Sequence, residues 1–160
     1  MKWASAIAEG DDLLTTLERC TGKVQETLGS GIQPTLATVF VHTGFPGDYG
    51  EVPGFLKAHW PEVIVLGCSA AGVIGGGIEI EQRPAVAITA GYLPDVNIHP
   101  FRVAGVDLPS PDDPPEAWTD LIGVPPQKNP HFLLLLDPFS TNGQDLLTGL
   151  DYAFPRSIKV

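Results

Sequence analysis

Three short, nearly continuous apolar runs constrain the fold of this chain more than any other feature. They occupy residues 36–41, 63–66 and 132–136. Continuous apolar sequence rich in β-branched residues is typical of strands that are covered on both faces, as in parallel α/β sheets. Segments with helical spacing follow the first and third runs. We therefore expect an α/β fold in which these three strands lie at the centre of a mixed sheet.

Two strand–helix–strand units can be recognised along the chain. Residues 39–66 align without a gap on residues 133–160, and Trp60-Pro61 falls on Phe154-Pro155. An internal repeat and the general similarity of any two such units both explain this alignment. In either case each unit predicts a parallel crossover, which is right-handed in about 98% of known cases.

The middle of the chain, residues 78–104, has no helical periodicity. Its apolar residues alternate or form short runs, and Leu93-Pro94-Asp95 marks a turn. This block predicts an antiparallel hairpin extension of the sheet. Before the first apolar run, residues 3–8 predict a strand, and Asp11 or Asp12 is expected to cap a helix that ends at Gly29 or Gly31.

Length and charge limit the classes of protein to consider. A chain of 160 residues suits one domain, and we expect residues 1–160 to form it. With 9 Lys+Arg against 19 Asp+Glu, the net charge of −10 repels phosphate backbones and anionic headgroups. We expect neither nucleic acid nor a membrane as a partner. There is no apolar run near the roughly 20 residues of a membrane span and no signal peptide. Two cysteines make no disulfide framework, so we predict a cytoplasmic protein.

A glycine-rich segment, residues 67–77, follows the second apolar run. Gly-Cys-Ser after a strand lets the backbone approach a ligand closely, although a tight turn explains the same residues. The glycine spacing does not match a Rossmann fingerprint, and the chain has no Gly-Lys-Ser or Gly-Lys-Thr of a phosphate-binding loop. We therefore predict no cofactor.

The loops after the three central strands predict a ligand site. Ligands of open α/β sheets bind at the carboxyl ends of the strands, so loops 42–44, 67–69 and 137–139 are expected to converge there. Asp137 has a second and commoner role, which is to cap backbone groups of its own loop. The predicted ligand-binding residues are His42, Thr43, Gly44, Gly67, Cys68, Ser69, Gly72, Gly75, Gly76, Gly77, Asp137 and Phe139.

Catalysis is the alternative function. Cys68 or Ser69 would be the nucleophile of an α/β hydrolase or transferase, with His42 as the base for Cys68. The Gly-X-Ser-X-Gly elbow is incomplete because Ala71 stands at its last position. Small cysteines at strand ends are usually inert, so no catalytic residue is assigned. The histidines show no metal-ligand spacing, and no metal site is predicted.

The segment 65–77, followed by Glu79 and Pro84-Ala85-Val86, resembles the N-terminal part of the FIST domain. The resemblance implies a sensory, signal-transduction module without catalytic activity, whose ligand is an amino acid or a similar small molecule. Members of this family continue beyond the strand that matches residues 157–160 and carry a second, C-terminal domain.

The last four residues, 157–160, are fewer than the roughly five or six of a usual strand, and no polar tail follows them. We therefore expect the chain to be a fragment of a longer protein. Its expected partners are a small-molecule ligand, the C-terminal remainder of the same protein, and a second copy joined through the unfinished sheet edge.

Overall fold

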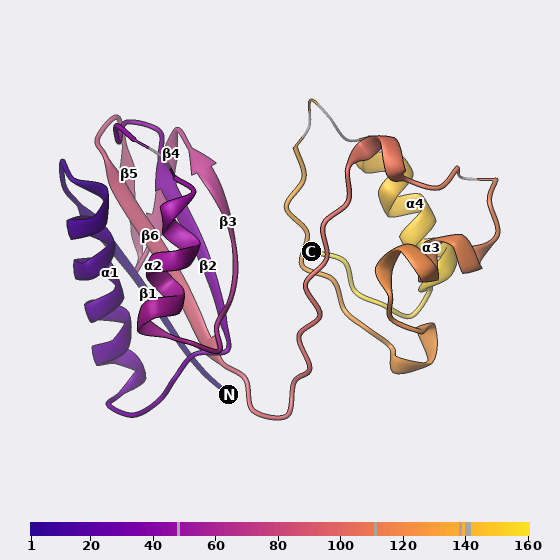
Figure 1. Cartoon of the computed structure of the whole chain (residues 1–160), viewed down its shortest axis with the longest axis horizontal. Helices are drawn as coiled ribbons and strands as arrows, with labels where there is room; N and C mark the ends of the chain where they lie inside the picture. The colour runs from indigo at the N-terminus through magenta and orange to yellow at the C-terminus, as the bar shows by residue number, and fades with distance from the viewer. Residues whose placement is uncertain (48, 111, 138, 140–141) are drawn as a thin grey trace. The chain divides into compact units, whose positions relative to one another are not determined.

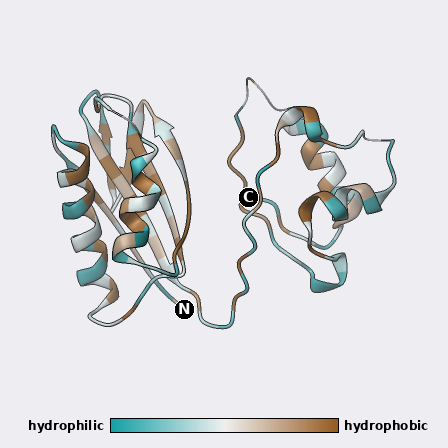
Figure 2. Cartoon of the chain, in the orientation of Figure 1, coloured by the Kyte–Doolittle hydropathy of each residue, from teal (hydrophilic) through white to brown (hydrophobic). Residues whose placement is uncertain are grey.

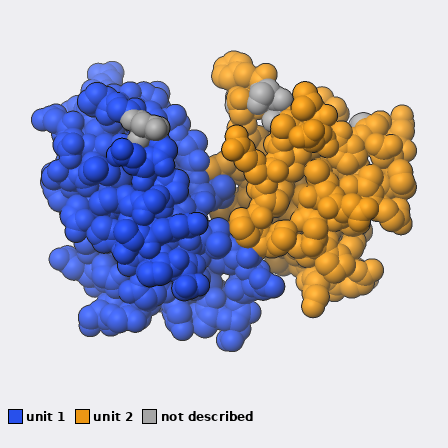
Figure 3. All heavy atoms as spheres, in the orientation of Figure 1, with its two compact units in different colours: residues 1–98 blue, residues 99–160 orange. Residues whose placement is uncertain are grey.

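The computed structural model describes residues 1–47, 49–110, 112–137, 139 and 142–160. The chain forms two compact units, Met1–Ile98 (unit 1) and His99–Val160 (unit 2), which are coloured separately in Figure 3. Each unit has its own apolar core. No helix of the described residues is both long enough and apolar enough to cross a membrane.

Unit 1 contains a mixed four-stranded sheet in the order β1-β6-β2-β3 (Figure 1). Strands β2 and β3 are parallel, whereas β6 is antiparallel to both β1 and β2. The predicted α/β class with a mixed sheet is thus confirmed. A separate antiparallel pair is formed by β4 and β5. The elements of unit 1 are β1 (Lys2–Glu9), α1 (Leu13–Leu28), β2 (Leu36–His42), α2 (Glu51–His59), β3 (Ile64–Ala70), β4 (Gly72–Gly75), β5 (Ile78–Glu81) and β6 (Ala85–Tyr92).

Helices α1 and α2 cover one face of this sheet. Their buried side chains share a core with alternate residues of the strands, such as Ala37, Val39 and Val41 of β2. Figure 2 shows the resulting two-sided colouring of the helices, hydrophobic on one side and hydrophilic on the other. The predicted cap of α1 is confirmed, since the Asp12 carboxylate accepts the Thr15 N–H at 2.8 Å. The predicted helix end at Gly29 is confirmed as well.

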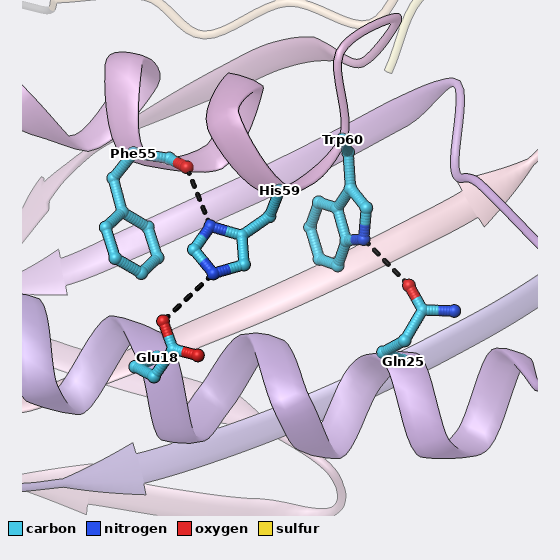
Figure 4. Close-up of polar contacts among 5 residues, drawn as sticks. All are labelled: Glu18, Gln25, Phe55, His59 and Trp60. Atoms are coloured by element: carbon cyan, nitrogen blue, oxygen red, sulfur yellow. Dashed lines mark hydrogen bonds and ion pairs between the residues drawn. The ribbon is translucent and has the colours of Figure 1, made fainter. Parts of the chain in front are cut away.

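Polar contacts join α1 to the end of α2 (Figure 4). The indole N–H of Trp60 donates to Gln25 Oε1 at 2.9 Å, and His59 Nε2 lies 2.9 Å from Glu18 Oε2. The other ring nitrogen of His59 lies 3.0 Å from the carbonyl oxygen of Phe55. Trp60 is 1% exposed, so its hydrogen bond is shielded from water, whereas the ion pair lies at the surface.

The prediction that residues 78–104 form an antiparallel hairpin at the edge of the sheet is wrong. β6 lies in the middle of the main sheet, between β1 and β2, and β5 pairs with β4. Residues 96–104 form no strand, and no helix occurs in 78–104. β6 takes a central position because both of its faces are buried: Val86 and Ile88 face the helices, and Ala85 and Ala87 face the β4–β5 hairpin.

Unit 2 is a small helical body. It contains η1 (Gly105–Asp107), α3 (Pro115–Ile122), η2 (Pro126–Lys128) and α4 (Gly143–Ala153). Its core combines aromatic and aliphatic side chains of α3, α4 and the chain around them: Trp118, Ile122, Phe132, Leu146, Leu150, Ala153 and Phe154.

Residues 132–136 are not a central strand, contrary to the sequence prediction. Within this run only Phe132 forms a β-bridge, which is parallel and pairs it with Lys159. Leu133, Leu135 and Leu136 are 44%, 40% and 40% exposed. A run of leucines shows that a segment is apolar but not what covers it. The parallel pairing across α4 does agree with the second predicted crossover unit, since the Phe132 N–H donates to the Ile158 carbonyl at 2.8 Å.

Candidate functional site

The carboxyl ends of β1, β2 and β3 lie at one edge of the sheet in unit 1, together with the amino end of β6. Backbone bonds tie the connecting segments together there. The Thr43 N–H donates to the Ala70 carbonyl at 2.9 Å, and the Gly10 N–H donates to the Pro84 carbonyl at 3.1 Å. We call this region, residues 9–10, 42–44, 70–72 and 83–84, the carboxyl edge.

His42 is the most informative side chain of the carboxyl edge. It is 8% exposed, and its Nδ1 accepts the Gly44 N–H at 2.9 Å. The neutral ring therefore carries its proton on Nε2. No described residue accepts a hydrogen bond from Nε2. Gly44 packs tightly at this point, because a Cβ there would lie 2.8 Å from His42 Nδ1. The imidazole is thus held in place on one side and retains one unused donor.

Two charged side chains lie at the same end of the sheet as this histidine segment. Arg83 Nη1 lies 2.7 Å from Glu9 Oε2, and both side chains are substantially exposed, at 66% and 42%. Sequence reasoning missed both residues, because the antiparallel register of β1 and β6 brings them together from distant parts of the chain. The edge therefore offers an N–H donor, a cation and an anion within one region.

The glycine-rich segment does not begin as a loop, which corrects the sequence prediction. β3 continues to Ala70, so Gly67, Cys68 and Ser69 are strand residues beside β2. A Cβ at position 67 would lie 1.9 Å from the Val39 carbonyl oxygen. Close approach of the two strands therefore explains Gly67 without a ligand.

The remaining predicted glycines of residues 67–77 lie in two separate parts of unit 1. Gly72 starts β4 at the carboxyl edge, where it pairs with Glu81. Gly75, Gly76 and Gly77 lie away from this edge, at the hairpin turn over β1, where the Gly76 N–H donates to Ser5 Oγ at 3.1 Å. Gly76 and Gly77 have φ angles of 58° and 79°, which side chains disfavour. The structure therefore separates these three glycines from the histidine.

Of the two proposed nucleophiles, only Cys68 shares a sheet face with His42. The register pairs Phe40 with Cys68 and His42 with Ala70, which puts Cys68 and His42 two positions apart on neighbouring strands. Ser69 points to the opposite face. The Cys68 thiol is exposed and makes no hydrogen bond with His42. The described residues include no cluster of three or more potential metal ligands.

The third predicted loop belongs to unit 2. Asp137 Oδ1 accepts the Phe139 N–H at 3.0 Å, so the carboxylate caps its own loop. Phe139 is 98% exposed, and Pro138 lies outside the described residues. The convergence of this loop with those of unit 1 stays a prediction. A shallow depression of about 600 Å³ in unit 2 is lined instead by Asp112, Asp113, Pro114, Pro115, Thr148 and Tyr152.

Comparison with known proteins identifies the family of this chain. No curated protein matches the chain. The model of one protein family, described as the FIST N domain, matches residues 35–160, which is most of the chain. The matched part begins just before β2 and includes the histidine segment, the glycine-rich strand and hairpin, and all of unit 2. The chain therefore belongs to the FIST N domain family, a family of sensory and signal-transduction domains.

Proposed function

We propose that this chain is the non-catalytic ligand-binding part of a sensory protein. The ligand is an amino acid or a similar small molecule with an anionic and a cationic group, and it binds at the carboxyl edge of unit 1. The observation that carries the proposal is His42, whose Nδ1 is occupied by the Gly44 N–H while Nε2 has no acceptor among the described residues. Among the described residues the buried side-chain polar atoms without a partner are Thr21 Oγ1 and Trp118 Nε1, so His42 Nε2 is open to solvent and to a ligand oxygen that can accept its hydrogen bond.

Charge around the histidine supports the choice of ligand. The Glu9–Arg83 ion pair is exposed, and such pairs contribute only about 0–1 kcal/mol. It can therefore exchange partners at little cost, so that Arg83 meets a ligand carboxylate and Glu9 meets an ammonium group. The exposed Thr43 hydroxyl adds a further polar contact beside His42. A doubly charged ligand would use all four side chains.

The alternative is an enzyme that uses Cys68. The shared sheet face of Cys68 and His42 favours it. A thiolate nucleophile normally needs a hydrogen-bonded base that a third group orients, and no described residue forms this arrangement. The sensory function therefore requires fewer additional assumptions.

A ligand screen with matched variants tests both functions. Thermal shift and NMR titration with L-amino acids and small anions should find a compound that stabilises the chain by about 2.7 kcal/mol at 100 times its dissociation constant. We expect His42→Gln to weaken binding by about tenfold or more, as loss of a hydrogen bond to a charged group does. His99→Gln, at an exposed histidine of unit 2, is the control and should bind normally.

Cys68→Ser separates the two functions. A sensor keeps its affinity in this variant, whereas an enzyme loses turnover of the bound compound. The proposal is wrong if the amide shifts caused by the ligand map outside residues 9–10, 42–44, 70–72 and 83–84, or if His42→Gln binds as well as the unchanged chain.

A further inference from the structure

One hydrogen bond at the carboxyl edge can form only while its histidine is neutral. The Gly44 N–H donates to His42 Nδ1 at 2.9 Å, so this nitrogen must keep its lone pair. A protonated imidazole carries an N–H group on both nitrogens and has no acceptor. Acid therefore turns this contact into two donors that face each other.

The space around Gly44 prevents a small adjustment from relieving this conflict. A Cβ built on Gly44 would lie 2.8 Å from His42 Nδ1 and 3.3 Å from Pro84 Cγ, so the ring and the proline both lie close to this backbone. His42 itself is buried. Turning the ring over does not restore the bond, because it places a carbon atom instead of Nδ1 before the Gly44 N–H. Protonation must therefore move either the ring or the backbone of residues 42–45.

We propose that residues 42–45 form a proton-operated switch, in which protonation of His42 releases the Gly44 N–H and displaces the segment. The inference deepens the proposed function and rests on it for the role of the switch, since His42 and Thr43 belong to the proposed ligand site. The neutral form holds one side of that site in place, and the acid form takes it apart. Binding of the ligand then depends on pH.

Contacts of the same segment lead from the histidine towards α2. The Phe45 N–H donates to the His42 carbonyl at 3.4 Å, and the Tyr49 hydroxyl donates to the Phe45 carbonyl at 2.9 Å. Phe45 is 4% exposed and belongs to the same core cluster as Val52 of α2. A displacement of Gly44 therefore acts directly on a neighbouring side chain of the core that α2 covers.

Other groups around His42 also respond to acid. The charged or titratable side chains on the segments around it are Glu9 of β1, Tyr49 before α2, Cys68 of β3, Glu79 and Glu81 of β5, and Arg83 before β6. Within the part of the chain that the structure describes, none of them shares a hydrogen bond or ion pair with the His42 ring. Because carboxylates also bind protons in acid, the titration must be read from the ring itself and not from stability alone.

A pH titration of the full chain without ligand tests the switch. Nitrogen and proton NMR signals of the His42 ring report its tautomer and its protonation, and the Gly44 amide reports the hydrogen bond. Between about pH 8 and about pH 5 we expect the ring signals and the Gly44 amide to change with the same midpoint. Protection of this amide from solvent exchange should fall at least about tenfold once the ring is protonated.

Two variants separate His42 from the other titrating groups. His42→Asn places an amide oxygen near the position of Nδ1, where it can accept the Gly44 N–H as in an Asx turn but binds no proton. Its Gly44 amide should stay protected throughout the titration. His131→Asn is the matched control, because His131 Nδ1 accepts the Ile158 N–H at 3.1 Å in unit 2. It should leave the response of Gly44 unchanged.

The inference is overturned if the neutral ring carries its proton on Nδ1, or if the Gly44 amide stays protected after the ring is protonated. It is also overturned if His42 stays neutral until the chain unfolds, or if His42→Asn loses Gly44 protection in acid as the unchanged chain does. The titration of the unchanged chain decides the matter by itself if the variant does not fold. Because no ligand is present, failure of the ligand screen leaves these results intact, and a ligand that binds at His42 does not rescue a Gly44 amide that ignores pH.

Discussion

Gln25 offers the sharpest test of what holds the two helices of unit 1 together. Its Oε1 accepts the Trp60 indole N–H at 2.9 Å, as Figure 4 shows. Its Nε2 donates to the carbonyls of Gly29 and Ile32 at 2.9 and 3.0 Å. Gln25→Leu keeps a side chain of similar size but removes all three bonds. The Trp60 N–H is then left without an acceptor in a site where the ring is 1% exposed.

The expected cost is set mainly by the Trp60 indole. A buried donor without a partner costs about 1–3 kcal/mol, whereas the two carbonyls belong to half-buried residues that water can reach. We therefore expect Gln25→Leu to lower the free energy of unfolding of unit 1 by about 2 kcal/mol. Glu18→Leu is the matched control on the same helix. It removes the partly exposed ion pair with His59 and should cost less than about 1 kcal/mol.

A double-mutant cycle isolates the hydrogen bond. In a Trp60→Phe background the indole N–H is absent, so Gln25→Leu should cost about 1–2 kcal/mol less than it does in the unchanged chain. Urea unfolding should be followed through NMR amide signals of unit 1, because Trp118 of unit 2 would add to the fluorescence. The reasoning fails if Gln25→Leu costs no more than Glu18→Leu, or if its cost is the same in both backgrounds.

Four further substitutions test other parts of the structure. Burial raises the pKa of the Cys20 thiol from 9.0 to about 11, so stability should be full below pH 9 and fall by about 2–3 kcal/mol as the pH rises to 11. Cys20→Ala should abolish this alkaline loss in pH-dependent urea unfolding. Hydrogen bonds from Thr15 lower the pKa of Asp12, so its stabilisation should be lost as the pH falls through the folded-state pKa, and Asp12→Asn should lack this acid dependence. Gly149→Ala should melt unit 2 at a lower temperature, because its Cβ would lie 2.1 Å from a buried tryptophan ring. Gly22→Ala, whose Cβ meets nothing within 4 Å, should stabilise α1 by up to about 1 kcal/mol; equal melting shifts for the two alanines would contradict the packing argument.

Part of the candidate site could be predicted because its residues lie at the end of a strand or directly after it. The apolar run 36–41 located β2, and the rule that ligands bind at carboxyl ends then selected His42, Thr43 and Gly44. The ion pair of Glu9 with Arg83 could not be predicted in this way. Its two residues are far apart in sequence, and only the register between β1 and β6 makes them neighbours.

The role of the glycines could not be predicted from the sequence. Small residues at 67–77 are compatible with a ligand loop, a tight turn or a closely packed strand, and the sequence does not distinguish these. The distances do: a Cβ at Gly67 would overlap the Val39 carbonyl, and one at Gly75 would lie 2.7 Å from the Ala6 carbonyl. The requirement for glycine at these positions comes from neighbouring strands.

The sequence by itself determined the local elements of this protein. The cap at Asp12, the helix end at Gly29, the crossover through α2 and the α/β class all depend on residues a few positions apart. Only the tertiary structure decided the neighbours of each segment. β6 lies at the centre of the sheet and β3 at its edge, whereas residues 132–136 are no strand of that sheet and bond through Phe132 and Leu134 to residues 158–160. The physical reason is that helix periodicity and capping are local interactions. The order of strands depends instead on which faces remain to be buried once all elements have packed, and apolar composition alone does not specify that order.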